Sequence, residues 1–145
     1  MKILLDAMLG HLLSWFRILG YDTLYWPSEG CDDALLKEAI TSHRIIITRD
    51  SLLFQKASKQ GVKCIYLPTY DTVNALAYLV KTLGIKLEFD ENETRCPECN
   101  AKLTKISITP KRWRCTNCGK EYWIGGHWRN IRRILNEVKQ RVEQT

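Results

Sequence analysis

The chain has 145 residues, is 45% hydrophobic and carries a formal net charge of +6. This length allows one ordinary domain with a small appendage, and the apolar content is typical of a globular protein. The N-terminus reaches Asp6 before any long apolar stretch, and no run approaches the roughly 20 apolar residues of a membrane span. We therefore expect neither a signal peptide nor a membrane segment, and we predict a cytoplasmic protein.

The basic excess lies in the C-terminal part of the chain. Residues 1–90 hold 10 Lys/Arg and 10 Asp/Glu, whereas residues 91–145 hold 12 Lys/Arg and 6 Asp/Glu. Such asymmetry suggests a polyanionic partner, although a solvated basic helix is the alternative. Residues 88–95 are polar and acidic, as in a linker. We predict one domain over residues 1–90 and a second unit over residues 91–145.

The first ninety residues alternate between strand and helix patterns. Strands are expected at 2–5, 22–26, 45–47 and 62–67, helices at 9–19, 32–40, 51–60 and 71–83, and a turn at 27–30. The run Ile45-Ile46-Ile47 is apolar on both faces, as in a central parallel strand covered by helices. Short links between these elements predict an α/β fold with a mostly parallel sheet, whose strands end at one common edge.

Four cysteines form two Cys-x-x-Cys pairs that are 15 residues apart: Cys96, Cys99, Cys115 and Cys118. This spacing is typical of a four-thiolate Zn²⁺ site, in which each pair supplies two ligands of one tetrahedron. A closed site leaves no position for substrate, so we expect a structural ion in a zinc ribbon too small to fold alone. Disulfides and redox thiols are the alternatives. Cys31 and Cys64 are expected to be small buried side chains.

Acidic residues recur at the ends of predicted strands and the starts of predicted helices: Asp6, Asp32, Asp33, Asp50 and Asp71. The last four are good helix N-caps when taken singly, whereas Asp6 precedes its helical pattern by several residues and fits a cap less well. Asp6 and Asp50 would face each other if their strands are neighbours, and such close carboxylates call for a hard cation. We therefore predict a catalytic Mg²⁺ or Mn²⁺ that activates water for phosphodiester cleavage.

Three landmarks follow one another along the chain. They are Leu9-Gly10 through Leu19-Gly20-Tyr21-Asp22-Thr23, then Ile45-Ile46-Ile47-Thr48-Arg49-Asp50, then Tyr122-Trp123-Ile124-Gly125-Gly126-His127-Trp128 after the cysteine pairs. Together they resemble the Mut-seven carboxy-terminal RNase family, a branch of the PIN-like nucleases, over nearly the whole chain. The resemblance implies a PIN-like three-layer α/β/α sandwich, a C-terminal zinc ribbon with a closing helix, and metal-dependent RNA cleavage. The ligands it implies are Asp6, Asp33 (or its neighbour Asp32) and Asp50, with Asp71 as the weakest match.

The first helical segment departs from the family pattern. It has His11 where the family usually has Lys or Arg, and Ser14-Trp15-Phe16 where the family has Ala-Arg-Trp. Loss of a cation near the first acid would leave phosphate contact to Arg17 and Arg49. His11 as a catalytic base is an alternative to the commoner role of a histidine in packing or at the surface.

Basic and aromatic residues interleave in the ribbon and the last helix. The basic residues expected to contact RNA there are Lys111, Arg112, Arg129, Arg132 and Arg133. Trp113, Tyr122 and Trp123 suit base stacking, but a small ribbon also needs them as apolar cover. The last helix is expected from about Trp128, with one apolar seam: Trp128, Ile131, Leu135, Val138 and Val142. His127 is expected to shape the start of this helix rather than to bind metal, and Trp128 to pack between ribbon and nuclease domain.

The sequence thus favours a ribonuclease acting on single-stranded or structured RNA. Two other functions stay open: a non-catalytic RNA-binding protein in RNA processing or ribosome maturation, and an adaptor whose zinc ribbon docks a protein partner.

Overall fold

A parallel sheet organises the N-terminal part of the chain. The structure is a computed structural model that describes residues 1–27 and 32–144. The strands of this sheet are β1 (Lys2–Leu5), β2 (Asp22–Tyr25), β3 (Ile45–Thr48) and β4 (Cys64–Tyr66). Their order is β2-β1-β3-β4, and each neighbouring pair is parallel. The isoleucine strand is therefore central, as predicted, and it lies directly beside β1.

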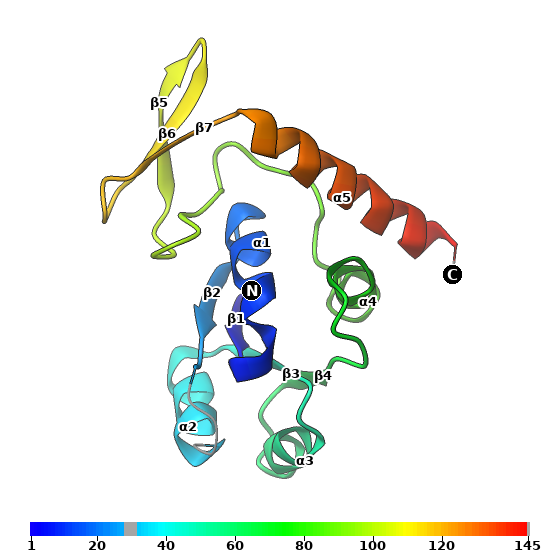
Figure 1. Cartoon of the computed structure of the whole chain (residues 1–145). Coiled ribbons are helices and arrows are strands. Elements are labelled where there is room, and N and C mark those ends of the chain that lie inside the picture. The colour runs from blue at the N-terminus through cyan, green and yellow to red at the C-terminus, as the bar shows by residue number, and fades with distance from the viewer. Residues whose placement is uncertain (28–31, 145) are drawn as a thin grey trace.

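Helices cover both faces of this sheet (Figure 1). One face carries η1 (Ala7–Leu12), α1 (Leu13–Ile18) and α4 (Thr72–Leu83), and the other carries α2 (Asp32–Ser42) and α3 (Ser51–Lys59). Successive strand residues point to opposite faces, so Leu5 and Ile47 join one buried cluster whereas Leu4 and Ile46 join the other. The predicted α/β/α layering is confirmed.

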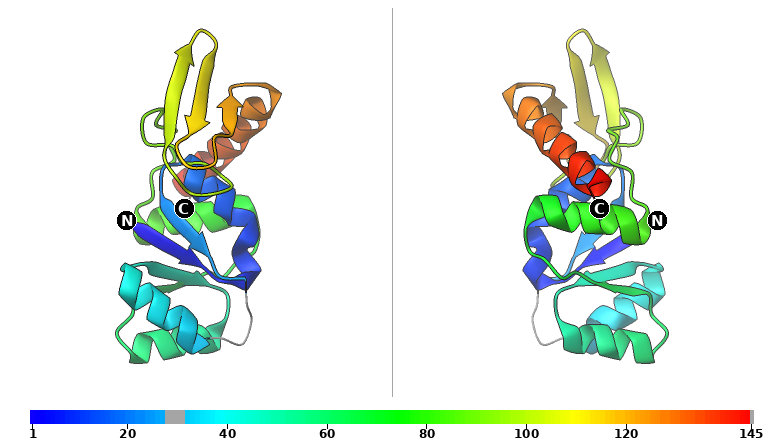
Figure 2. Two further views of the ribbon diagram at one scale, coloured as in Figure 1. Left: turned by 90° about the vertical axis from the view of Figure 1, so that its left-hand side faces the viewer. Right: turned by 90° about the vertical axis from the view of Figure 1, so that its right-hand side faces the viewer.

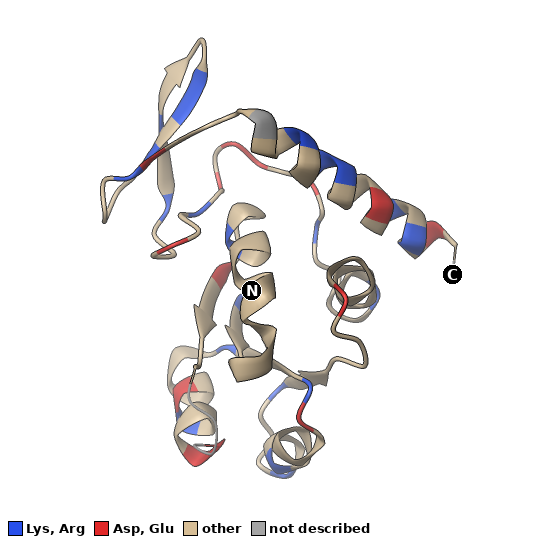
Figure 3. Ribbon diagram, in the orientation of Figure 1, with Lys and Arg blue, Asp and Glu red and all other residues tan. Residues whose placement is uncertain are grey.

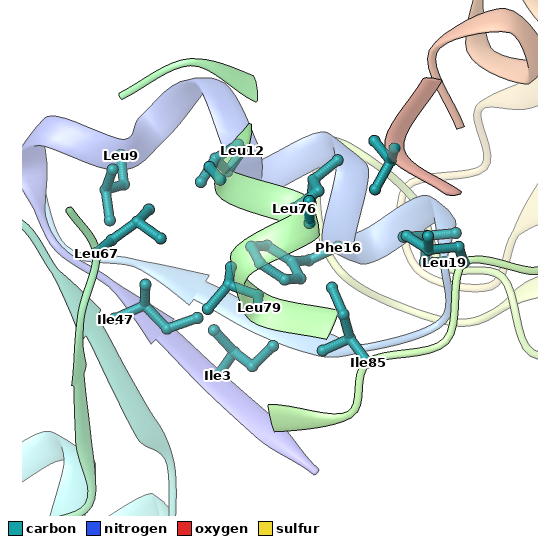
Figure 4. Close-up of a cluster of buried hydrophobic side chains, with 14 of the residues drawn as sticks. Ile3, Leu9, Leu12, Phe16, Leu19, Ile47, Leu67, Leu76, Leu79 and Ile85 are labelled. Carbon is teal, nitrogen blue, oxygen red and sulfur yellow. The ribbon is translucent and has the colours of Figure 1, made fainter. Parts of the chain in front are cut away.

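The larger cluster lies between the sheet and η1, α1 and α4 (Figure 4). Phe16 of α1 and Leu76 of α4 are fully buried there against Ile3 of β1. Burial of each such side chain stabilises the fold by roughly 1.5–3 kcal/mol. The helical leucine stripes read from the sequence are the residues that form this core.

The first helical segment differs from its prediction as one continuous helix. It starts as the 3-10 helix η1 and becomes α-helical only at Leu13, with a kink at Leu9 (φ −112°, ψ 19°). A tight contact accompanies the kink, because a Cβ on Gly10 would lie 3.1 Å from the Tyr25 ring. The Tyr25 hydroxyl donates a hydrogen bond to the Ala7 carbonyl at 2.8 Å. Gly10 therefore allows η1 to approach Tyr25 of β2 closely.

The C-terminal part holds a second, antiparallel sheet and one long helix. The strands are β5 (Leu103–Ile108), β6 (Lys111–Cys115) and β7 (Glu121–Trp123), in that order, followed by α5 (Gly126–Glu143). The β5–β6 hairpin extends away from the body of the molecule (Figure 2). The cysteine cluster at its base is consistent with the predicted zinc ribbon.

Helix α5 returns to the N-terminal part and packs beside α4. Leu135 and Val138 are buried in the larger cluster, with Ile131 and Val142 partly buried against it. Arg141 donates a hydrogen bond to the Asn74 side chain of α4 at 2.8 Å. The predicted apolar seam therefore faces the parallel-sheet domain.

The segment predicted as a linker is packed between the two parts. Phe89 makes edge-on ring contacts with Trp113, at 5.8 Å between centroids, and with Trp128, at 4.4 Å. Thr94 is buried and donates a hydrogen bond to the Ile18 carbonyl at 2.8 Å. Trp128 thus packs against the segment that connects the parallel-sheet domain to the ribbon, and its packing between the two parts stays a prediction. The domain boundary at residue 90 stays a prediction.

The two cysteines outside the Cys-x-x-Cys pairs, and the predicted turn at 27–30, were also compared with the structure. Cys31 and most of the turn predicted at 27–30 lie outside the described residues. Cys64 is half-buried, and burial together with the negative charge of Asp6 raises the pKa of its thiol to about 12. A neutral thiol of this kind packs as a small apolar side chain.

Within the described ranges, no helix has the length and apolar character that crossing a membrane requires.

Candidate functional site

Asp6 lies at the carboxyl end of β1 and is only 7% exposed. Its carboxylate accepts a hydrogen bond from the Met8 backbone N–H at 3.2 Å and another from the Thr48 hydroxyl. Asp6 is therefore the N-cap of η1. The expectation that Asp6 fits a cap poorly was wrong, because the helix begins at Ala7 as a 3-10 turn, before the apolar stripe starts.

Thr48 links Asp6 to Asp50 across the sheet edge. The Asp6 backbone N–H donates to the Ile47 carbonyl of β3 at 3.3 Å, which brings Thr48 beside the Asp6 carboxylate. Thr48 is fully buried, and its hydroxyl also accepts a hydrogen bond from the Asp50 backbone N–H at 2.9 Å. Sequence reasoning gave Thr48 no role. The signal was a hydroxyl at the end of a buried apolar strand, which must find hydrogen-bond partners.

Asp50 has the capping role that its sequence position suggested. Its carboxylate accepts hydrogen bonds from the backbone N–H groups of Leu52 at 2.9 Å and Leu53 at 3.3 Å. The carboxylate nevertheless lies close enough to Asp6 to change its ionisation. Capping and a role at the sheet edge are therefore combined in one residue.

The environment of Asp6 opposes its ionisation. Burial raises the pKa of Asp6, hydrogen bonds from Thr48 and Met8 work against this rise, and the charges of Asp50 and Asp32 add to it. Among the described residues, no Lys, Arg or His forms an ion pair with Asp6. A buried carboxylate that lies near other carboxylates and forms no ion pair with a described cation fits the ligand chemistry of a hard divalent cation.

The remaining acids occupy different positions. Asp32, in the first turn of α2, is half-buried, lies 3.4 Å from the Lys56 ammonium, and acts electrostatically on Asp6. Asp33 is exposed in the same turn. Asp71 is exposed and caps α4 through the Asn74 N–H at 3.0 Å. Asp50 and Asp32 therefore lie near enough to Asp6 to raise its pKa, whereas no interaction of Asp33 or Asp71 with Asp6 is found in the described part of the chain.

The carboxylates are less tightly grouped than the cysteines. Of the described His, Cys, Asp and Glu side chains, only the four cysteines form a set of three or more whose ligand atoms all lie within 4.8 Å of one another. The described acids therefore do not form a closed metal site of the kind that the four cysteines make.

The two arginines expected to contact phosphate differ in their surroundings. Arg49 is half-buried between Thr48 and Asp50, and its Nε donates to the Leu67 carbonyl at 3.3 Å. Arg17 is only 6% exposed, and its guanidinium donates to the carbonyls of Thr23 at 3.0 Å and Pro97 at 2.8 Å. This burial does not support the phosphate role expected for Arg17, because its guanidinium holds the first cysteine turn against β2.

His11 packs against the loop before α4. Its Nε2 lies 2.8 Å from the Tyr70 carbonyl oxygen, and the two rings lie 4.1 Å apart between centroids. This arrangement favours packing over the alternative of a catalytic base.

The four cysteines form a site of the size that zinc requires. The sulfur atoms of Cys96 and Cys118 lie 3.9 Å apart, and those of Cys99 and Cys115 lie 3.1 Å apart. A tetrahedron with metal–sulfur bonds of about 2.3 Å has sulfur–sulfur edges of about 3.8 Å. His127 is not part of this set and lies in the first turn of α5, as expected.

The ionisation of the cysteines also suits a cation. Hydrogen bonds from the Ala101 backbone and Cys115 lower the pKa of Cys99 to about 6. A Lys120 backbone hydrogen bond lowers the pKa of Cys118, but burial and the other three cysteines outweigh it and raise the value to about 11. Four neighbouring thiols therefore resist full ionisation until a positive ion lies among them.

The ribbon aromatics divide between core and surface. Trp113 is 3% exposed and donates its indole N–H to the Glu91 carbonyl at 3.0 Å, as a core residue would. Tyr122 is half-buried, with its hydroxyl 3.2 Å from the Cys96 sulfur. Trp123 is 65% exposed. The role of apolar cover therefore suits Trp113, whereas Trp123 is open to a ligand.

The basic residues expected to contact RNA lie mainly along α5 (Figure 3). Arg129, Arg132 and Arg133 are exposed there, and Arg133 also lies 2.5 Å from the Asn130 side chain and 3.5 Å from Glu137. In the ribbon, Arg112 is exposed, whereas Lys111 forms an ion pair with Glu91.

Comparisons with known proteins add one finding. A family model described as the Mut7-C RNAse domain matches residues 1–135. The match spans the parallel sheet, the cysteine cluster and about half of α5, in agreement with the resemblance drawn from the sequence landmarks. Neither the curated proteins nor the solved structures contain a match to the chain.

Proposed function

The chain belongs to the Mut7-C RNAse domain family, and we propose that it is a metal-dependent ribonuclease that hydrolyses RNA phosphodiester bonds. One observation carries the proposal. A buried carboxylate, Asp6, forms no ion pair with any Lys, Arg or His that the structure describes, and it is linked through Thr48 to Asp50 at the edge where parallel strands end. Ligands gather at this edge in open parallel sheets.

Asp6 and Asp50 are the side chains best placed to hold Mg²⁺ or Mn²⁺, with Asp32 as a third acid. Such an ion, when bound, activates water and offsets the negative charge of the phosphoryl transition state. Thr48 would fix the orientation of the Asp6 carboxylate, and Arg49 would contact a phosphate oxygen. Asp33 and Asp71 stay weaker candidates, because their exposed positions give them no contact with Asp6.

The cysteine cluster would hold one structural Zn²⁺ with no open position. Four thiolates and one Zn²⁺ together carry a charge of −2, so the formal charge of +6 would fall to about +4. The chain would therefore stay basic, and its exposed arginines would supply affinity that is independent of RNA sequence. Four reduced cysteines also suit a reducing compartment such as the cytoplasm.

The test is RNA cleavage by the full-length, zinc-loaded protein. We expect labelled single-stranded RNA to be cut with Mn²⁺ or Mg²⁺, and the rate to fall by about 100-fold or more in Asp50→Asn and Asp6→Asn. Asp90→Asn is the matched control, because Asp90 is exposed and only caps a turn at Asn92. This control should cut RNA at the wild-type rate.

The other outcomes identify the alternatives. Tight RNA binding without cleavage under either ion would indicate a non-catalytic RNA-binding protein in RNA processing or ribosome maturation. Neither binding nor cleavage would indicate an adaptor that docks a protein through its ribbon.

A further inference from the structure

A cavity of about 200 Å³ lies where the ribbon meets α5. Its walls include six ring side chains from the ribbon, the preceding segment and the start of α5: Phe89, Trp113, Tyr122, Trp123, His127 and Trp128. None of the three acids at the sheet edge lines it. The cavity is therefore a separate feature from the proposed catalytic edge.

Two buried N–H groups in the lining residues have no acceptor. Arg95 Nε and Trp128 Nε1 are both shielded from solvent, and neither has a hydrogen-bond partner within the described part of the chain. Buried donors are normally paired, and an orphaned pair beside a cavity points to a ligand that carries acceptor atoms. A purely hydrocarbon ligand would leave both donors unsatisfied.

A basic groove begins at the same tryptophan. This second hollow, of about 410 Å³, is lined by Trp128 and then by Arg129, Arg132 and Arg133 along the exposed face of α5. Glu137 also lines it, at 3.5 Å from the Arg133 guanidinium. The remaining arginines make this groove complementary to a chain of phosphates.

We propose that the aromatic cavity takes one unpaired nucleobase of a single-stranded RNA while the α5 arginines contact the phosphates beside it. A base has a flat π-face for the ring-lined walls and ring nitrogens or carbonyl oxygens for the orphaned donors. The exposed Trp123 would close over the base at the mouth of the cavity. The proposal rests on the proposed function only in that RNA is the ligand, since base binding needs no catalysis.

The experiment measures binding of a fluorescent single-stranded oligoadenylate to the full-length, zinc-loaded protein by anisotropy, without added Mg²⁺ or Mn²⁺. We expect Trp123→Ala to weaken binding by about five-fold to a hundred-fold, the range for loss of one base stack. Trp128→Phe keeps the ring and removes the N–H, and it should weaken binding to a smaller degree. Ile108→Ala, which shortens a 75% exposed apolar side chain of the same ribbon, is the control without effect.

The salt dependence of RNA binding distinguishes the contribution of the cavity from the contribution of the α5 arginines. Trp123→Ala should leave the slope of log K against log salt unchanged, whereas Arg129→Gln with Arg132→Gln should reduce that slope by about 1.4, the value for loss of two phosphate contacts to a single strand. An abasic oligonucleotide of the same length should bind the wild type as weakly as oligoadenylate binds Trp123→Ala. Zinc content and circular dichroism verify that each variant is folded.

Unchanged affinity in both Trp123→Ala and Trp128→Phe would overturn the proposal, as would equal binding of the abasic chain. A peptide or small apolar occupant would give these same results. Cleavage separates the two proposals. Base-dependent binding without cleavage would contradict only the proposed ribonuclease activity. Cleavage together with unchanged affinity in Trp123→Ala would contradict only the proposed base-binding cavity.

Discussion

At the scale of single residues, the sheet edge depends on a buried hydroxyl. Thr48 donates to the Asp6 carboxylate and accepts from the Asp50 N–H, so one side chain sets the geometry between two acids. Each acid also caps a helix. Local capping holds the acids in place, and Thr48 orients them relative to each other.

We expect Thr48→Val to reduce RNA cleavage by roughly 10-fold to 100-fold, the usual effect of removing a side chain that orients a ligand. Valine keeps the shape but leaves the Asp50 N–H without its acceptor, which should destabilise the fold by about 1–3 kcal/mol. Cleavage and urea denaturation measure the two effects. Thr48→Ser keeps the hydroxyl and should restore most of the activity. Equal losses in both variants would point to packing instead.

The raised pKa of Asp6 predicts a pH-dependent stability without divalent cations. Because the folded-state pKa lies above the unfolded value of about 3.9, the stabilisation is complete below that value and is lost as pH rises through the folded-state pKa. Asp6→Asn should therefore match wild type in acid and have a higher Tm than wild type at neutral pH. Thermal melts at several pH values measure the difference.

Mn²⁺ provides the control for this comparison. It should raise the Tm of wild type, because it binds the folded state, and should have little effect on Asp6→Asn. If the Tm of wild type and of Asp6→Asn changed with pH in the same way, Asp6 would ionise as freely as a surface carboxyl, contrary to this prediction.

At the scale of elements, the first cysteine turn is docked on the edge strand β2. The Asn100 amide accepts from the Thr23 backbone N–H at 3.0 Å and donates to the Asp22 carboxylate at 2.7 Å. Arg17 adds its bond to the Pro97 carbonyl. The ribbon thus covers a strand edge that would otherwise expose unpaired backbone groups.

Removal of the proposed zinc ion should therefore lower the local stability of β2 as well as that of the ribbon. We expect a thiol-directed chelator to speed amide hydrogen exchange at Thr23, because the turn that presents Asn100 loses its metal. Asn100→Gly in the zinc-loaded protein should give the same local change without affecting β6, because glycine removes the amide and accepts the left-handed backbone of this position (φ 72°). Exchange followed by mass spectrometry measures both, and unchanged protection of β2 after zinc loss would refute the coupling.

At the scale of the whole molecule, α5 connects the ribbon to the main core. Arg129, Arg132 and Arg133 are exposed on this helix, whereas Leu135 and Val138 are buried in the larger cluster together with residues of α4. One helix therefore supplies both the basic surface and part of the core.

Because α5 belongs to both, we predict that the ribbon and the parallel-sheet domain unfold cooperatively. Leu135→Ala should cost about 2–5 kcal/mol and lower the unfolding midpoint reported by tryptophan fluorescence and by circular dichroism together. Asn136→Ala, next to it on the exposed face, should have little effect. Two separate transitions in the wild type would mean that ribbon and sheet domain unfold independently.

The periodic and spaced features could be read from the sequence. The isoleucine strand, the leucine stripes, the α5 seam and the paired cysteines each follow from a local repeat or a fixed spacing, and such patterns determine which faces are buried. The acids at strand ends followed from the rule that parallel strands end at a common edge. The alternation of strands and helices, and with it the layered fold, was predictable because each element has its own local hydrophobic repeat.

Partners from distant segments could be read only from the tertiary structure. The pairing of β1 with β3 brings Thr48 to Asp6, and Asp32 in the first turn of α2 acts electrostatically on Asp6. Hydrogen bonds to the Thr23 and Pro97 carbonyls occupy Arg17. No periodicity encodes such contacts, because they depend on the register and packing of segments far apart in the chain. The sequence by itself determined that four cysteines form one cluster and that acids recur at the strand ends, and the tertiary structure decided which side chains each of them contacts.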